Sequence, residues 1–197
     1  MNLTTLSQVK AMLELSETDW DALIEELIAA ASGRAGTYCN RDFEQQERED
    51  YHDGGGQYLY LRGLPVVEIA AIYGSDTWEW EDADLISKDE YALLSAGMVA
   101  YRSGPWPYGP KALKVTYTGG YNSPPAEGEE EPEGYILIPA DLEMAARTQV
   151  VYDFKRRKDI GLESISFPDG SIQKVNSGEF LPSVKSVLDR YRMRPYG

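Results

Sequence analysis

The sequence predicts an α+β protein: a helical bundle formed by the N-terminal and C-terminal segments, with an antiparallel β module inserted between them. Apolar residues recur at helical spacing near both ends of the chain. The middle of the chain instead alternates apolar and polar residues in short runs that turn residues separate. At 197 residues the chain can bury a sizeable core. We place the helical parts at 1–44 and 135–197, the β module at 45–121, and an acidic, proline-rich loop at 122–134.

Two helices are predicted in the first part. A capping-box sequence at Thr5 begins a short helix over 6–13, and a weaker cap at Ser16 precedes the next helix. The second helix has the clearest apolar period, which is carried by Trp20, Leu23, Ile24, Leu27, Ile28 and Ala31. We expect it to reach Tyr38 although it contains two glycines, because close packing would compensate for their cost of about 1 kcal/mol each.

The C-terminal half of this second helix carries a face of small residues. Ala29, Ser32, Gly33 and Gly36 belong to it. Small side chains let a neighbouring backbone approach closely, and a helical unit of this size has few other faces to bury. Two interpretations stay open, a core contact within the chain and an interface between subunits.

Short strands are predicted for the β module, at residues 45–52, 58–62, 66–73, 91–94, 98–102 and 112–118. The first two flank a glycine turn at Gly54–Gly56. Turn residues separate the later runs, and none has a helical period. The pattern indicates a small antiparallel sheet or barrel.

The last part is predicted to hold two helices with a hairpin between them. Pro139 stands near the first position of one helix, where a missing N–H has little effect. The basic run 155–158 either complements the dipole at the end of that helix or contacts acidic neighbours or DNA. A hairpin with Asp-Gly at its tip follows over 164–175. Pro182 then begins a final helix that covers 184–192.

Composition excludes several classes of protein. With 19 basic and 33 acidic residues the net charge is −14, so we do not expect a general nucleic-acid binder. The lone Cys39 excludes an internal disulfide, and we expect it to be a small buried residue at a helix end. We see no signal peptide. No apolar run reaches membrane-spanning length, so we predict no membrane partner.

No motif predicts an enzyme. His52 is the only histidine and has no catalytic motif around it, and one histidine with one cysteine cannot form a metal cluster. Gly54–Gly56 lacks the lysine of a phosphate-binding loop, and the acids of 79–84 lack calcium-loop spacing. We therefore predict no catalytic residue, no cofactor and no metal.

Aromatic residues concentrate in the β module. We single out Trp78, Trp80 and Trp106 as exposed aromatic candidates. In an extended segment Trp78 and Trp80 would lie on one face. Three interpretations stay open: a sheet core, a protein interface hot spot and a platform for sugar stacking. The alternative function is therefore a ligand-binding β module, for example a carbohydrate-binding one, on a helical base.

Two stretches of the chain resemble a known family. The first is Leu3–Phe43, with Leu-Thr-Thr-Leu-Ser-Gln-Val-Lys near its start and Ala-Gly-Thr-Tyr-Cys-Asn-Arg-Asp-Phe at its end. The second is Ile138–Arg194, a helix, a polar hairpin and a proline-led helix ending in Leu-Asp-Arg-Tyr-Arg. Both are similar to the head–tail connector (adaptor) proteins of tailed bacteriophages. Residues 61–66 also look like members of that family with a β module, whereas residues 78–134 match nothing that we can place.

The resemblance implies a structural subunit of a connector ring that docks under the portal, surrounds the DNA channel and links capsid to tail. It implies a dodecameric ring in the virion, with portal protein and tail or head-completion proteins as partners. The protein would be made in the host cytoplasm. DNA would pass without specific binding, since an acidic wall does not hold it. The family's use of its C-terminal region points to Arg190, Arg192, Arg194 and Tyr196 as portal contacts.

Overall fold

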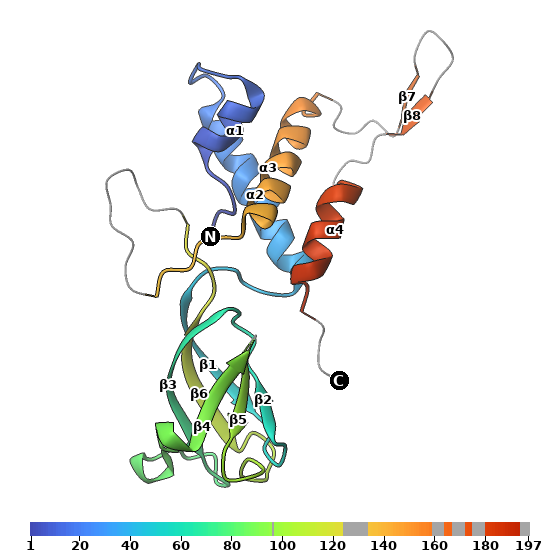
Figure 1. Ribbon diagram of the computed structural model, residues 1–197. Coiled ribbons are helices and arrows are strands. Elements are labelled where there is room, and N and C mark those ends of the chain that lie inside the picture. The colour runs from blue at the N-terminus through green and yellow to red at the C-terminus, as the bar shows by residue number, and fades with distance from the viewer. Residues whose placement is uncertain (96, 124–133, 159–163, 167–171, 175–179, 194–197) are drawn as a thin grey trace. The chain divides into compact units, whose positions relative to one another are not determined.

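The computed structural model describes the chain except for residues 96, 124–133, 159–163, 167–171, 175–179 and 194–197. It combines helices with antiparallel strands, so the predicted α+β class is confirmed (Figure 1). The chain forms two compact units. The helical unit comprises Met1–Asn40 and Ile138–Gly197, and the β unit comprises Arg41–Leu137.

The helical unit contains α1 (Leu6–Leu13), α2 (Asp21–Cys39), α3 (Ala140–Lys155) and α4 (Pro182–Tyr191). α1 packs on α2 and α3, and α4 packs on the same two helices. The unit also contains β7 (Ser164–Ser166) and β8 (Ile172–Lys174), which pair antiparallel. The predicted hairpin is therefore confirmed, while its Asp-Gly tip lies outside the described residues.

Local sequence decides where α1 and α4 begin. Thr5 and Gln8 form the predicted capping box of α1, and Pro182 occupies the first turn of α4. The predicted cap at Ser16 is wrong, because Trp20 precedes α2 and provides no side-chain cap. The Asp21 N–H instead donates to the Thr18 carbonyl, 3.1 Å away, so a backbone turn begins this helix.

The core of the helical unit is the apolar stripe of α2 packed on α3 and α1, with Val9, Ile24, Ile28, Ala31, Val150, Val151 and Phe154. Burial of such a stripe provides most of the stability of helices this short. Cys39, the last residue of α2, is buried as predicted.

A buried polar network links three helices of this unit. Gln149 of α3 is fully buried, and its Oε1 accepts a hydrogen bond of 3.0 Å from the backbone N–H of Leu181, the residue before α4. The Gln149 Nε2 donates to Asp153 Oδ1 over 2.9 Å, and Arg34 of α2 forms a salt bridge with the other oxygen of Asp153. Because both buried polar groups of Gln149 are satisfied, the network fixes where α4 begins.

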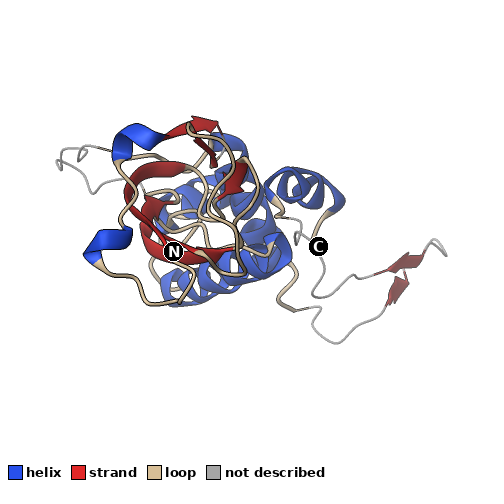
Figure 2. Ribbon diagram, turned by 90° about the horizontal axis from the view of Figure 1, so that it is seen from below, coloured by secondary structure: helices blue, strands red, loops and turns tan. Residues whose placement is uncertain are grey.

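The β unit contains two three-stranded antiparallel sheets. The first has the order β1 (Gln46–His52), β6 (Leu113–Gly119), β3 (Val66–Gly74). The second has the order β2 (Tyr58–Tyr60), β5 (Met98–Tyr101), β4 (Tyr91–Ser95). Figure 2, in which strands are red, shows their curved course. The two short helices η1 (Asp82–Asp84) and η2 (Lys88–Glu90) lie between β3 and β4.

The predicted strands all occur, and the first two flank the glycine turn as predicted without pairing with each other. β1 pairs with β6, and β2 pairs with β5, so the glycine turn at Gly54–Gly56 joins strands of different sheets. The backbone of this turn makes long-range bonds instead: Gly54 N–H donates to Gly109, and Gly55 N–H to Trp106. A turn bonded to a distant loop cannot also close a two-residue hairpin.

Strand β6 carries the core of the β unit. Its burial alternates strictly, with Leu113, Val115 and Tyr117 fully buried. The Tyr117 hydroxyl accepts a 2.7 Å hydrogen bond from the Gly63 N–H and donates one of 2.6 Å to Asp50. Burial, with this bond to a carboxylate, raises the pKa of Tyr117 far above its ordinary value.

The prediction that Trp106 is exposed is wrong. Its side chain is only 2% exposed, and its ring stacks on Tyr101 at 4.8 Å and lies 6.5 Å from Tyr91. Trp106 is part of the core that β6 builds. The backbone at Trp106 is held by hydrogen bonds to the glycine turn, in which its N–H donates to Gly56 and its carbonyl accepts from Gly55.

Candidate partner-binding surfaces

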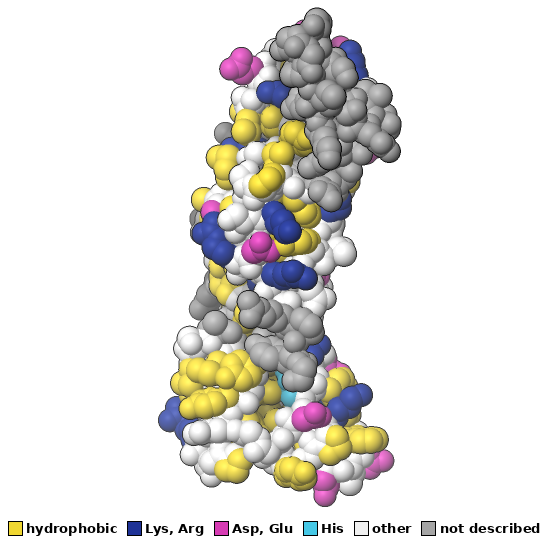
Figure 3. Space-filling model, turned by 90° about the vertical axis from the view of Figure 1, so that its right-hand side faces the viewer, with side chains coloured by type: hydrophobic (Ala, Val, Ile, Leu, Met, Phe, Trp, Pro, Cys, Tyr) yellow, Lys and Arg dark blue, Asp and Glu magenta, His cyan; other side chains and the backbone are white. Residues whose placement is uncertain are grey.

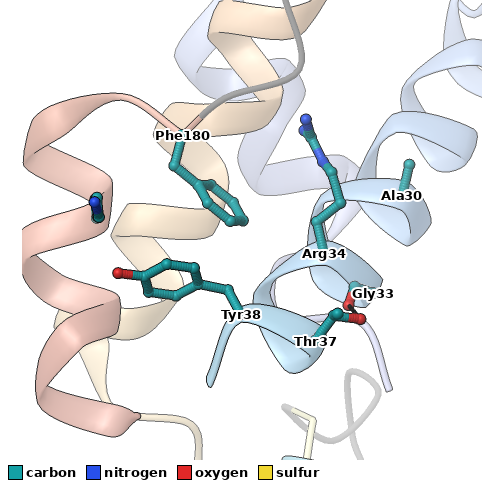
Figure 4. A pocket seen from close by; sticks show the side chains of 7 residues that line it. Ala30, Gly33, Arg34, Thr37, Tyr38 and Phe180 are labelled. Carbon is teal, nitrogen blue, oxygen red and sulfur yellow. Dashed lines mark hydrogen bonds between the residues drawn. The ribbon is translucent and has the colours of Figure 1, made fainter. Parts of the chain in front are cut away.

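A groove of about 740 Å³ lies between α2 and the start of α4 (Figure 4). α2 supplies Ala30, Gly33, Arg34, Thr37 and Tyr38, whereas Phe180 and Lys185 come from the segment that begins α4 and from α4 itself. The lining thus combines small residues with two aromatic rings, and both of its charged side chains are basic.

Aromatic and charged contacts fix the shape of this groove. The rings of Tyr38 and Phe180 meet edge to face, 5.7 Å apart, and the Arg34 guanidinium lies 5.5 Å from the Phe180 ring centre. The Tyr38 hydroxyl donates to the Asp189 carboxylate, which raises the pKa of Tyr38. The groove is therefore formed before any partner binds, and the entropy lost on binding is reduced.

The predicted small-residue face divides between core and surface. Ser32 is buried, and its hydroxyl accepts a 3.0 Å hydrogen bond from the Leu3 N–H, so it acts within the chain. Ala29 and Gly33 are exposed, and Gly36 is half-buried. A methyl group placed on Gly33 meets no neighbouring atom within 4 Å. Gly33 therefore opens onto the groove, and its position meets no core contact within the chain.

The predicted portal contacts fall only partly within the described residues. Arg190 is exposed and lies 3.4 Å from Asp141 of α3. The Arg192 guanidinium lies 5.2 Å from the Tyr38 ring centre, beside the groove. Arg194 and Tyr196 lie outside the described residues. A role for these residues in binding a portal stays a prediction.

A second pocket, of about 570 Å³, lies in the β unit. Tyr51, Asp53, Trp78, Trp80, Pro110 and Lys111 line it. Trp78 and Trp80 share this pocket, but the backbone at Trp78 is left-handed, with φ of 64°, and not extended as predicted. Trp78 is 57% exposed, while Trp80 is half-buried and packs 4.9 Å from Tyr51.

The outer face of the sheet β2-β5-β4 is also apolar. Tyr58 lies opposite Ala100, and Tyr60 lies opposite Met98. Both tyrosines are exposed, as is Leu94 of β4. Figure 3 shows hydrophobic side chains at the surface of the molecule in yellow. An antiparallel sheet usually turns polar residues to solvent, and apolar exposed faces are typical of contacts with other proteins.

Several residues of these surfaces escaped sequence analysis. Phe180 and Lys185 join the groove because Gln149 fixes the start of α4 beside α2. Tyr51 and Lys111 join the aromatic pocket because β1 and β6 pair in register. No local pattern marks these residues; only long-range contacts bring them to the two sites.

Other kinds of site were sought in the described residues. They contain no group of three or more side chains suited to hold a metal ion. None of their helices is long and apolar enough to cross a membrane. His52 is the last residue of β1, as expected, and burial lowers its pKa, although Asp50 lies 4.0 Å from its ring.

Comparison with protein families identifies the chain. A model described as "Head completion protein" matches residues 2–194. The chain belongs to the head completion protein family. This confirms the predicted membership of the phage head–tail connector class and a structural role in joining head and tail. A comparison with curated protein sequences finds no match.

Solved structures show the same fold as this head completion protein. One is a chain from the neck of an empty gene transfer agent particle computed with C6 symmetry, with 15% identity and a TM-score of 0.58. The match covers 98% of this chain and 91% of that one. A chain from the neck of the native particle computed with C12 symmetry matches with 14% identity and a TM-score of 0.52, covering 98% and 90%. At such low identity the likeness establishes the fold.

Proposed function

We propose that this head completion protein is the subunit of a ring that docks under the portal, surrounds the DNA channel and receives the tail. Membership of the family supports this role, and the neck structures computed with C12 and C6 symmetry support a dodecameric ring. The protein acts in the virion after synthesis in the host cytoplasm, and its role is structural, with no turnover and no cofactor.

The helical unit forms the ring as a bundle of its N-terminal and C-terminal parts, with the β module and the acidic loop as insertions between them. The bounds of 1–44, 45–121, 122–134 and 135–197 follow from the changes in sequence pattern. Because the two ends of the chain share one compact unit, the β unit can vary without breaking the connector.

Neighbouring subunits meet at the groove between α2 and α4. A cyclic ring needs a heterologous contact, in which one face of a subunit meets a different face of the next. The groove supplies a basic face, with Arg34 and Lys185 around the open position at Gly33. The exposed Glu25 and Glu26, in the N-terminal half of α2, supply an acidic face for the next subunit. The open surface at Gly33 is the observation that carries this proposal.

The C-terminal segment binds the portal. Arg190 and Arg192 are basic groups on a chain whose net charge is −14, so they form a local attraction for an acidic partner. Arg194 and Tyr196 extend the same basic and aromatic segment, and both residue types are enriched among interface anchors. The acidity of the rest of the chain keeps passing DNA from adhering to the channel wall.

Charge exchange tests the subunit contact. Native mass spectrometry of the protein alone and with portal should detect a ring in at least one sample. Glu26→Lys and Lys185→Glu should each abolish the ring, and the double variant should restore part of it. Lys88→Glu, on the β unit, is the matched charge control. Failure to form any ring with the wild-type protein, with or without portal, would overturn the connector proposal.

Deletion of Met193–Gly197 tests the portal contact. Helix content should stay unchanged because α4 ends at Tyr191, and thermal unfolding should change little, although the Met193 N–H donates to the Cys39 carbonyl over 2.9 Å. Binding to portal in a pull-down should be lost. If the shortened protein binds portal as well as the full chain does, the C-terminal segment is not the anchor.

A further inference from the structure

The aromatic pocket of the β unit is held by unusual backbone. Among the described residues, four non-glycine residues have positive φ. Glu14 and Asn40 are the C-caps of α1 and α2, where this conformation is common. The other two, Trp78 with φ of 64° and Lys111 with φ of 50°, both line the pocket. Such a conformation is unfavourable for a bulky residue and is concentrated at ligand-binding sites.

Specific hydrogen bonds hold both residues in place. The Trp78 indole N–H donates to the Pro110 carbonyl over 2.9 Å. The Lys111 backbone N–H donates to Asp53 Oδ1 over 2.7 Å. These bonds tie the loop that follows β3 to the segment before β6, and that segment to the end of β1. Trp78 is thus kept 57% exposed in one position, as a rigid recognition surface requires.

The aromatic rings around this pocket already bind a cation of the chain itself. The Lys114 ammonium lies 5.7 Å from the Trp80 ring centre and 5.8 Å from that of Tyr73. A hydrogen bond and ion pair with Glu49, 3.1 Å away, raise the pKa of Lys114 and keep it charged. The exposed rings of Tyr51 and Trp78 offer the same quadrupole to a second cation.

Charge beside the pocket favours a basic ligand. The loop that carries Trp78 and Trp80 also carries Asp76, Glu79, Glu81, Asp82 and Asp84. No salt bridge joins any of these carboxylates to a basic side chain in the part of the chain that the structure describes. Lys111 is the basic residue of the lining, and the charge of the neighbouring Lys114 is compensated by its ion pair with Glu49. The local field therefore attracts cations and would repel a phosphate or an acidic segment.

We propose that this pocket binds an arginine-bearing, extended segment of a partner protein. The guanidinium lies over the faces of Trp78 and Tyr51, and the carboxylates of the Trp78 loop compensate its charge. Arginine is favoured over lysine because its planar group stacks on aromatic rings and is weakly hydrated. A pocket of about 570 Å³ has room for such a side chain and its neighbours. The proposal does not depend on formation of the ring.

Titration with a matched peptide pair tests this. The probes are acetyl-Gly-Arg-Pro-Arg-Gly-amide and the same peptide with citrulline in place of both arginines, which removes charge and keeps shape. The signals of the tryptophan indole N–H groups are followed by NMR in the full-length protein. We expect the arginine peptide to shift the Trp78 and Trp80 signals saturably, with at least about fivefold weaker binding for the citrulline peptide.

Substitutions separate the pocket from the rest of the surface. Trp78→Ala should weaken binding of the arginine peptide about 5- to 30-fold, whereas Trp78→Phe should retain most of it because an aromatic face remains. Tyr108→Ala is the matched control, since Tyr108 is 88% exposed and does not line the pocket. Thermal unfolding of each variant establishes that the fold is intact.

Four outcomes of the binding experiments would overturn the proposal. They are the absence of a saturable shift, equal binding of the citrulline peptide, loss of binding in Tyr108→Ala but not in Trp78→Ala, and shifts of the same signals by chitotriose without any by the peptide. The last result would assign the pocket to a carbohydrate. Dissociation of a protein oligomer on addition of the peptide would assign the pocket to a second copy of the chain, and would equally overturn it.

Discussion

Replacement of Gly33 should have opposite effects on the free subunit and on its assembly. Glycine inside a helix is less stable than alanine by about 0.8–1.0 kcal/mol, and leucine is nearly as favourable as alanine. A methyl group on Gly33 meets no neighbouring atom within 4 Å, so no clash offsets this gain for alanine, and the rest of a leucine side chain can extend into the open groove. Gly33→Ala and Gly33→Leu should therefore stabilise the free protein by about 1 kcal/mol, which raises the Tm of a unit of this size by about 4–8 °C.

The same replacements should weaken assembly of the ring. If the groove receives a neighbouring subunit, leucine at Gly33 fills space that the neighbour needs, and such overpacking costs about 1–3 kcal/mol per contact. Each contact then weakens by about 5- to 150-fold. Differential scanning fluorimetry measures the free protein, and native mass spectrometry with portal measures the ring. Gly33→Ala, which adds only one methyl group, should keep the gain in stability with a smaller effect on assembly.

A control and two results test this reasoning about Gly33. Ala11→Leu, on the exposed side of α1, adds similar bulk away from the groove and should leave assembly unchanged. A fall in the Tm of free Gly33→Leu would show that the chain itself packs against this position. A raised Tm with unchanged assembly would remove the groove from the list of subunit contacts.

Three further predictions concern stability. Tyr117→Phe should destabilise the β unit by about 1–3 kcal/mol in urea unfolding, because the Gly63 N–H loses its buried acceptor; a change below about 0.5 kcal/mol would show that water replaces it. Gln149→Leu should cost the helical unit about 1–3 kcal/mol, because the Leu181 N–H loses its acceptor, and unchanged unfolding would remove Gln149 from the network that fixes α4. Burial lowers the pKa of His52, so below about pH 6.5 the unfolded chain binds a proton that the folded chain does not, and stability should fall as pH falls. His52→Gln should flatten that dependence, and an unchanged slope of Tm against pH would assign it to other groups.

Local elements follow from sequence because their causes are local. The capping box at Thr5, the apolar period of α2 and the alternation of β6 each decide a conformation within a few residues. Pro182 likewise marks the first turn of α4. The resemblance to connectors rested on the order and length of such elements, and the family match confirms it.

Tertiary contacts decided what each surface presents. The sequence grouped Ser32 with Gly33. In the structure Ser32 is buried and accepts a hydrogen bond from the Leu3 N–H, whereas Gly33 has open space beside it. It grouped Trp106 with Trp78, but packing on Tyr101 buries Trp106. In each pair the residues are alike in type and local pattern, so nothing within a few residues distinguishes them.

The sequence by itself therefore determined the α+β class, the helices and strands, and membership of the connector family. The tertiary structure alone decided that β1 pairs with β6 and that Trp78 and Lys111 line one pocket. The physical reason is the distance along the chain over which each kind of interaction acts. Propensity, capping and periodicity act over one or two turns of chain, whereas strand pairing and burial depend on residues brought together from distant positions.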